Sequence, residues 1–315
     1  MKAIVLKEQG GVENFTFESV SVPTIKDDEV LIKVRAVSIN PADAIVRENK
    51  SVSWIFGEES SLILGWDVSG QIVQKGAKVI DMQIGDDIFG VLRHPYIGRT
   101  YAEFVAAPAS QLAIKPKNST YEEAAATSLA ALTALQPIQK VGIKKNDRVF
   151  ITAAGGGVGH FAVQFAKYFG AHVTALASSS KKDFVMSLGA DEFIDYQLGP
   201  FENTLKKDMD LVIEAVKSDG HIMRSMEVVK PGGSLISLWS NITEEENLKA
   251  KSLNINAFYN MVSFNGQDMK FVAKLLEEGK LVPHISKVFS WKDIAKAHLE
   301  IEKGQTQGKI VIIMD

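Results

Sequence analysis

A glycine-rich turn between an apolar strand and an apolar helix constrains the fold of this chain more than any other feature. Residues 149–153, VFITA, form a short apolar run typical of a buried strand, and glycines follow at 155–157 and 159. Apolar residues then recur at helical spacing up to Phe169, and Gly170 is a natural helix stop. Glycines let a backbone approach phosphates, and a helix N-terminus attracts negative charge. The segment therefore predicts a pyrophosphate site.

The loop departs from the usual dinucleotide fingerprint at one point, because Ala154 stands where the first glycine is expected. The alternative interpretation is a glycine-rich turn that only joins a core strand to a helix. We favour the phosphate site because the segment that follows also fits it. The residues expected to bind the cofactor here are Gly155, Gly156, Gly157 and Val158.

The end of the next predicted strand, residues 172–177, indicates which dinucleotide binds. An NAD site usually has an acidic residue there for the ribose hydroxyls, but no acid occurs before Asp183. The chain instead reads ASSSKK, and hydroxyl and ammonium groups suit a 2′-phosphate. A serine-rich loop that caps the next helix would look the same, and both can hold at once. We favour NADP(H), with Ser178, Ser179, Lys181 and Lys182 as binding residues.

Composition narrows the class of protein. The 315 residues are 46% hydrophobic and 23% charged, which is enough chain for two domains with cores of their own. A net charge of −3 argues against nucleic-acid or membrane-surface partners. No apolar run approaches the ~20 residues that span a bilayer, and the first residues lack the apolar core of a signal peptide, so we expect a cytoplasmic location. Without cysteine, disulfides, thiolate catalysis and Cys-ligated zinc are excluded.

The order of predicted elements gives the fold class. Residues 1–117 contain mostly strand-like runs separated by Gly, Asp, Asn and Pro. From Tyr121 onwards helices and strands alternate, which is typical of a parallel, doubly wound sheet. We therefore expect an α/β chain, with a Rossmann doubly wound parallel sheet and a second, mostly-β domain.

A series of short motifs, each weak alone, occurs in one order along nearly the whole chain. They are SINPAD at 38–43, GWDVSG at 65–70, GDDIFG at 85–90, YAEFV at 101–105, the helix at 122–135, SLGADE at 187–192 followed by DY, KPGGS at 230–234 and GKIV at 308–311. In these motifs the chain resembles the zinc-free quinone oxidoreductases, the ζ-crystallin-like and alkenal/enone-reductase branch of the medium-chain dehydrogenase/reductase superfamily.

The resemblance implies two domains with a substrate cleft between them. A GroES-like catalytic domain would comprise residues 1–117, completed by 260–315, and a Rossmann NADP-binding domain would comprise 118–259. It also implies a homodimer that extends the Rossmann sheet, and the apolar run 255–264 is where we expect that edge.

The residues at the zinc positions of the superfamily differ here. Its zinc-using members have a Cys near position 40 and a His in a G-H-E turn, where this chain has Asn40 and Trp66. Catalytic zinc needs about three Cys, His or carboxylate ligands, and the six histidines show no metal-ligand spacing. We therefore expect no metal site. Hydride transfer from NADPH to a quinone or an α,β-unsaturated carbonyl remains feasible, since such acceptors need no Lewis acid.

The resemblance also assigns roles to single residues. Asn40 would face nicotinamide and substrate and donate to the acceptor carbonyl; a turn-stabilising role before Pro41 is the alternative. Thr127 would contact the nicotinamide end, or else bond back to its own helix. Tyr196 would contact the adenosine side, or else only pack. The residues expected to line the nicotinamide are Leu238, Phe264 and Asn265.

Two further expectations concern the surroundings of the cleft. Asp43 and Arg47 are expected to form a structural pair beside it. Trp54, Phe56 and Trp66 are candidates for an apolar acceptor wall, although aromatic residues more often belong to a core. The competing hypothesis for the whole protein is an NADPH-binding redox-responsive or structural protein without significant turnover.

Overall fold

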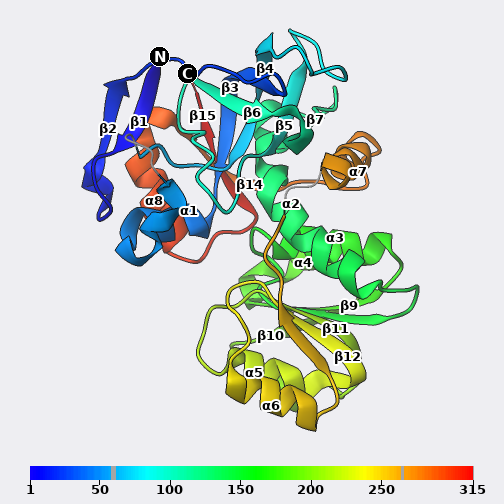
Figure 1. Ribbon diagram of the computed structural model, residues 1–315. Coiled ribbons are helices and arrows are strands. Elements are labelled where there is room, and N and C mark those ends of the chain that lie inside the picture. The colour runs from blue at the N-terminus through cyan, green and yellow to red at the C-terminus, as the bar shows by residue number, and fades with distance from the viewer. Residues whose placement is uncertain (58–61, 264–265, 315) are drawn as a thin grey trace. The chain divides into compact units, whose positions relative to one another are not determined.

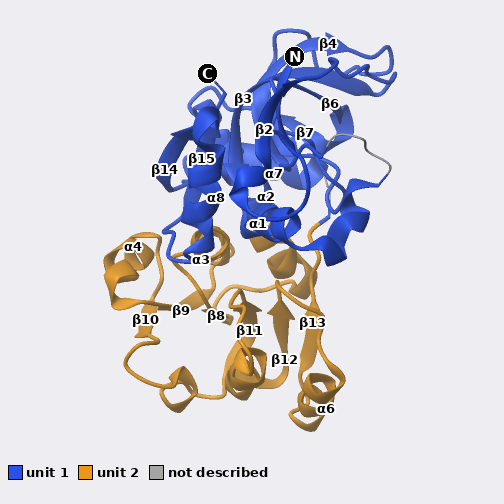
Figure 2. Cartoon of the chain, turned by 90° about the vertical axis from the view of Figure 1, so that its left-hand side faces the viewer, with its two compact units in different colours: residues 1–132, 263–315 blue, residues 133–262 orange. Residues whose placement is uncertain are grey.

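The computed structural model describes residues 1–57, 62–263 and 266–314 (Figure 1). The chain divides into two compact units, which Figure 2 colours separately. The first unit comprises residues 1–132 and 263–315, and the second comprises residues 133–262. The boundary between residues 132 and 133 falls within one helix, α2 (Tyr121–Val141).

The first unit is built on a mixed β-sheet. In its described part the sheet has seven strands in the order β14-β15-β3-β4-β5-β7, with β6 paired to β3. The strands are β3 (Glu29–Ile39), β4 (Asp67–Lys75), β5 (Asp87–Val91), β6 (Phe104–Pro108), β7 (Leu112–Ile114), β14 (Ile285–Ser290) and β15 (Lys309–Ile313). All pairs are antiparallel except β14 with β15. Because β15 pairs with β3, the C-terminal strand is part of the same sheet as the N-terminal segment.

Helices and a hairpin complete the first unit. They are β1 (Lys2–Leu6) and β2 (Phe15–Ser19), which pair with each other, α1 (Pro41–Glu48), α7 (Gly266–Glu277), α8 (Ile294–Glu302) and the N-terminal part of α2. Helices α1 and α8 contact one another and lie beside the hairpin (Figure 1). This mostly-β unit agrees with the predicted GroES-like architecture.

The second unit contains the Rossmann sheet that the sequence predicts. Six strands lie in the order β10-β9-β8-β11-β12-β13, all parallel, among the described residues. They are β8 (Arg148–Ile151), β9 (His172–Ala177), β10 (Glu192–Asp195), β11 (Met209–Glu214), β12 (Val229–Ser237) and β13 (Asn256–Tyr259). Numbered along the chain this is the order 3-2-1-4-5-6, whose direction reverses between β8 and β11. The expected fold class is confirmed.

Helices cover both faces of this parallel sheet. Helix α3 (Gly159–Tyr168) lies on one face and α5 (His221–Ser225) and α6 (Glu244–Ser252) on the other, with α4 (Lys182–Ser187) between β9 and β10 in the chain (Figure 1). Phe161 and Phe165 of α3 are fully buried, as are the central residues of β8 and β11. Burial on both faces explains why these strands read as continuous apolar runs rather than as alternating patterns.

Some predicted bounds were wrong. In the strand-like motif YAEFV at 101–105, strand β6 begins only at Phe104, and Tyr101 is buried in a bend before it. Where the alternation predicts a helix after β11, the chain forms the short α5 and a 3₁₀ turn, Met226–Val228. Of the described residues in the run 255–264, those from Asn256 to Tyr259 form strand β13. These differences lie at element ends, where local propensity is weakest.

Candidate functional site

The glycine turn connects β8 to α3 at the point where the strand order reverses. The backbone of Ala153 is left-handed, with φ of +49°, and the Gly156 N–H donates to its carbonyl oxygen at 2.9 Å. A Cβ on Gly159 would lie 2.2 Å from the Ala153 oxygen, so only glycine permits this approach of helix to turn. Gly155, Gly157 and Val158 lie in the same turn. The predicted pyrophosphate residues are therefore together at a helix N-terminus.

The serine- and lysine-rich segment lies beside the glycine turn. Ser178 follows β9, and a 3₁₀ turn, Ser179–Lys181, leads into α4. A Cβ on Gly155 would lie 2.7 Å from Cδ of Lys181, so the alkyl chain of this lysine rests against the turn. Burial lowers the pKa of Lys181, whereas Lys182 is exposed. The structure thus brings the two predicted halves of a dinucleotide site together within one unit.

Tyr196 belongs to the same end of the sheet. It follows β10, its backbone N–H donates to the Ala177 oxygen at 3.3 Å, and its side chain is 56% exposed. The ring is therefore not core packing, and its place next to the end of β9 suits a contact with the adenosine side of a nucleotide.

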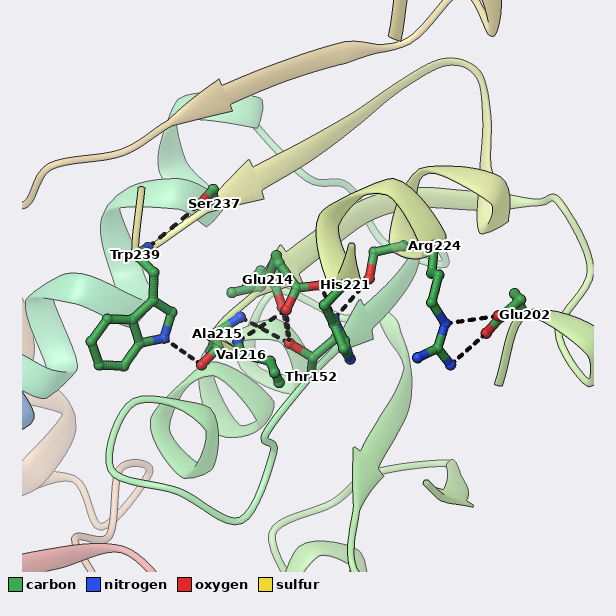
Figure 3. Close-up of polar contacts among 11 residues, drawn as sticks. Thr152, Glu202, Glu214, Ala215, Val216, His221, Arg224, Ser237 and Trp239 are labelled. Carbon is green, nitrogen blue, oxygen red and sulfur yellow. Dashed lines mark hydrogen bonds and ion pairs between the residues drawn. The ribbon is translucent and has the colours of Figure 1, made fainter. Parts of the chain in front are cut away.

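A buried carboxylate at the end of β11 organises the neighbouring backbone, and sequence reasoning missed it. Glu214 is 1% exposed, and its Oε1 accepts from Thr152 Oγ1 at 2.8 Å and from the Val216 N–H at 2.9 Å (Figure 3). Its Oε2 lies 2.9 Å from His221 Nδ1 and accepts from Ser225 Oγ. Since Thr152 immediately precedes the glycine turn, Glu214 joins that turn to the chain after β11.

The end of β12 joins the same network. Leu238, predicted to line the nicotinamide, follows β12, and its N–H donates to the Glu214 backbone oxygen at 3.0 Å. The Trp239 indole N–H donates to the Ala215 oxygen at 2.5 Å (Figure 3). Ligands of such sheets bind outside the carboxyl ends of the strands, so Glu214 and Trp239 support the expected binding edge. The sequence signal that could have identified Glu214 is an acidic residue at the end of an apolar strand.

In the first unit Asn40 lies in a buried polar cluster. Its amide Nδ2 donates to Asp67 Oδ2 at 2.9 Å, and its Oδ1 accepts from Lys309 Nζ at 2.5 Å. Asp67 also accepts from Ser38 Oγ and, at 2.7 Å, from the Leu129 N–H. Burial raises the pKa of Asp67 and lowers that of Lys309, and the attraction between the two groups opposes both shifts.

The start of α1 is held by Asn40 and Asp43. The Asn40 N–H donates to Asp43 Oδ2 at 2.8 Å, and the Asp43 N–H donates to the Asn40 carbonyl oxygen at 2.9 Å, with Pro41 as the first helical residue. The pKa of Asp43 is raised to about 7, first by burial and also by the nearby Asp67, while hydrogen bonds from Asn40 oppose the rise. The turn role of the Asn40 backbone is therefore present, while its side chain bonds Asp67 and Lys309.

The expected pair of Asp43 with Arg47 was wrong. Arg47 instead contacts Glu302 of α8, with 2.6 Å between Nη2 and Oε1. The partner lies 255 residues away in sequence, so no local pattern indicates it.

Thr127 is fully buried, and its hydroxyl donates to the Glu123 carbonyl oxygen at 2.7 Å. This is the back-bond that was the alternative to a nicotinamide contact. The bond uses the hydroxyl hydrogen but leaves an acceptor lone pair, so a cofactor role of Thr127 stays a prediction.

The candidate acceptor wall is mostly core. Trp66 and Phe56 are buried, whereas Trp54 is exposed and its ring meets that of Tyr96 edge-on, 6.1 Å between centroids. Phe264 and Asn265 lie outside the described residues. Of the other predicted residues, Asn40 and Thr127 belong to the first unit, and the cofactor residues belong to the second.

The residue types do not fit a zinc site. Among residues 1–57, 62–263 and 266–314, no group of three or more His, Cys, Asp and Glu could hold a metal ion. Asn40 and Trp66 occupy the positions at which zinc-using members of the superfamily have ligands, and Trp66 Nε1 donates to the Tyr96 oxygen at 2.7 Å. In the same part of the chain, no helix combines the length and apolar character needed to cross a membrane.

Known proteins resemble this chain over its whole length. The family described as "Alcohol dehydrogenase GroES-like domain" matches residues 26–117, and that described as "Zinc-binding dehydrogenase" matches residues 188–312. A 2-methylene-furan-3-one reductase of Solanum lycopersicum is 35% identical, across 99% of this chain and 79% of the relative. An NADPH-dependent alkenal/one oxidoreductase, chloroplastic, of Arabidopsis thaliana is 32% identical over the same shares.

A solved structure, the quinone oxidoreductase from Coxiella burnetii, has a TM-score of 0.92 at 31% identity, and the match covers 100% of this chain and 99% of that one. The similarity in backbone therefore accompanies similarity in sequence along both units.

Proposed function

This chain belongs to the quinone and alkenal oxidoreductases of the medium-chain dehydrogenase/reductase superfamily, and from that premise we propose that it reduces quinones or α,β-unsaturated carbonyls with NADPH and without a metal. The observation that carries the proposal is the glycine turn at the strand-order reversal, with Lys181 against it. The partner that this reaction requires is a small-molecule acceptor. We propose no nucleic-acid or membrane partner.

Each of the residues named below has its own role in the proposed reaction. Bound NADPH supplies the hydride. The backbone of Gly155, Gly156, Gly157 and Val158 approaches the pyrophosphate, and the α3 N-terminus supplies N–H groups and positive potential. Asn40 donates a hydrogen bond to the acceptor oxygen as negative charge develops on it. Solvent then protonates the product. The alternative, a binding protein without turnover, is disfavoured because the relatives are named reductases and oxidoreductases.

Turnover in the presence of EDTA tests the function. We expect the protein to oxidise NADPH with an ortho-quinone, a para-quinone or a short 2-alkenal, at a rate that EDTA leaves unchanged, because the chain has no cysteine and has Asn40 and Trp66 at the positions of the superfamily's zinc ligands. The measurement is steady-state NADPH absorbance. Binding of NADPH without turnover on any of the three acceptors would contradict the reductase and support the binding-protein alternative.

The preference for NADP over NAD rests on the segment after β9. We expect Lys181→Ala with Lys182→Ala to raise KM for NADPH far more than for NADH, since each lost contact to a 2′-phosphate removes ~1.5–3 kcal/mol. Lys251→Ala, on the exposed side of α6, is the matched control. Equal changes in the KM for NADPH and the KM for NADH would show that these lysines do not contact a 2′-phosphate.

A homodimer is also part of the proposal. Strand β13 is at the edge of the parallel sheet and pairs with β12 on one side in the described residues, so its other side can pair with a second copy. Sedimentation equilibrium is expected to give twice the chain mass of 34.4 kDa, and a monomer mass would contradict the dimer.

We further propose a cytoplasmic location. Because some relatives are named chloroplastic or mitochondrial, fractionation of the source cell is the test.

A further inference from the structure

A strained residue lies at the start of the glycine turn. Ala153 has a φ of +49°, a left-handed conformation that is costly for alanine because its Cβ crowds the backbone. Its carbonyl oxygen accepts from the Gly156 N–H at 2.9 Å, and the same oxygen faces Gly159. The shape of the turn therefore depends on this one conformation. A residue of this kind keeps its conformation only where the surrounding structure holds it.

Hydrogen bonds hold the backbone on both sides of Ala153. After it, the Ala154 N–H donates to the Leu176 oxygen of β9 at 3.0 Å. Before it, the Thr152 N–H donates to the Ile213 oxygen of β11 at 3.1 Å. The turn is thus bound to the two strands that flank β8 in the sheet.

The side chain of Thr152 adds a further contact, to the chain at the end of β11. Its hydroxyl donates to Glu214 Oε1 at 2.8 Å and accepts from the Ala215 N–H at 2.8 Å (Figure 3). The Ile213 oxygen also lies 3.4 Å from this hydroxyl, but the shorter contact to a carboxylate is the stronger one. Thr152 is fully buried, so the protein itself supplies the partners of its hydroxyl.

The Glu214 carboxylate is itself held by several donors. Oε1 also accepts from the Val216 N–H at 2.9 Å, while Oε2 accepts from the Ser225 hydroxyl and lies 2.9 Å from His221 Nδ1. The residue is 1% exposed. The carboxylate therefore cannot rotate without losing several hydrogen bonds at once, which makes it a rigid acceptor for the Thr152 hydroxyl.

We propose that Glu214 is a positioning residue for NADPH, which acts through the Thr152 hydroxyl to keep Ala153 left-handed, so that the glycine turn has the shape a pyrophosphate requires before the cofactor arrives. The inference rests on the proposed function. In it Glu214 does not touch the cofactor, and no bond is made or broken. A turn held in its binding conformation binds more tightly, because the cofactor does not have to order it.

Removal of one hydroxyl tests the proposal. Thr152→Val keeps the shape of the side chain and removes both hydrogen bonds of its hydroxyl. We expect Kd for NADPH to rise about tenfold, as for a turn that is in its binding conformation about a tenth of the time. Thr174→Val is the matched control, because Thr174 is also fully buried and its hydroxyl donates to Glu192 Oε2 at 3.1 Å, but it lies within β9. We expect the control to keep the wild-type Kd in a fluorescence titration with NADPH.

Two substitutions of Glu214 test whether it acts as an acceptor. Glu214→Gln keeps an oxygen for Thr152 and Val216, and its NH₂ group can donate to Ser225 Oγ and His221 Nδ1 once that hydroxyl rotates and the ring changes tautomer. We expect this variant to bind NADPH within about twofold of the wild type, and Glu214→Met, which has no acceptor oxygen, to raise Kd about tenfold. In the Thr152→Val background, Glu214→Met is expected to have no further effect.

A further substitution tests the route through Ala153. Glycine adopts left-handed backbone without the cost that alanine bears. Ala153→Gly is therefore expected to lower the Kd of the Thr152→Val variant by about threefold or more. If Thr152 served only the overall stability, no such recovery would occur, because glycine does not restore the lost hydrogen bonds.

The outcomes are distinct. Equal Kd values for Thr152→Val and Thr174→Val overturn the inference, as does a Glu214→Gln variant that binds as weakly as Glu214→Met. A Kd of Thr152→Val that Ala153→Gly leaves unchanged also overturns it. If Glu214→Met does not fold, Thr152→Val decides, because that variant leaves the carboxylate with its other partners. A wild-type protein that binds no NADPH contradicts the proposed function, and the inference with it.

Discussion

Gly159→Ala is expected to lower the free energy of unfolding by about 1–3 kcal/mol and to abolish measurable NADPH binding. Alanine normally stabilises a helix by ~1 kcal/mol relative to glycine. The expected loss of stability is therefore opposite in sign to the effect of helix propensity. The reason is contact with backbone. The new Cβ would lie 2.2 Å from the Ala153 oxygen and 2.6 Å from the Ala154 Cα, and neither atom can move without moving the turn. Urea unfolding and NADPH fluorescence titration measure the two effects.

Gly156→Ala is the matched control in the same turn. Its Cβ would meet the Ala153 oxygen at 3.2 Å, which a small shift accommodates. This variant is therefore expected to keep the wild-type stability and to weaken NADPH binding, since the methyl group occupies the approach of the pyrophosphate. If Gly159→Ala kept both stability and binding, the turn would not be packed as described.

Asp43→Asn is expected to be increasingly more stable than the wild type as the pH rises from about 4.5 to 7. The folded pKa of Asp43 is about 7, against 3.8 for the ordinary carboxyl. Between these values the folded wild type holds one more proton than the unfolded chain. The stability from this group is thus complete below about 3.8, falls by ~1.4 kcal/mol per pH unit, and is lost above about 7. The variant, which stays neutral, has no such loss.

The difference between the two proteins is the quantity to measure, because His298 acts with the opposite sign. Burial lowers the pKa of His298 from 6.5 to about 3, so its contribution rises with pH across that interval and offsets Asp43 in the wild type. Subtracting the two stability curves removes His298. The amide oxygen that the substitution leaves at position 43 can still accept from the Asn40 N–H, so the helix start is kept. A difference that stays constant with pH would contradict a protonated Asp43.

Two features of the fold, the parallel sheet and the glycine turn, could be predicted from local sequence patterns. A parallel sheet that is buried on both faces requires continuous apolar strands, and these can be recognised in the sequence. The close approach of α3 to the turn requires glycine at position 159, which the sequence also shows. The basic segment after β9 was found in the same way, because its distance from the glycines is set by one helix and one strand. The fold class and the cofactor end of the site depend on such short-range relations.

The polar clusters were decided only by the tertiary structure. Asn40 could be singled out, but its partners Asp67 and Lys309 are 27 and 269 residues away, and Arg47 meets Glu302 rather than the nearer Asp43. Glu214 looks like an ordinary strand end until Thr152, 62 residues away, is placed beside it. A buried charge must find partners, and which partners reach it depends on how distant strands are brought together in one sheet. That arrangement is a property of the folded chain and has no period or spacing in the sequence.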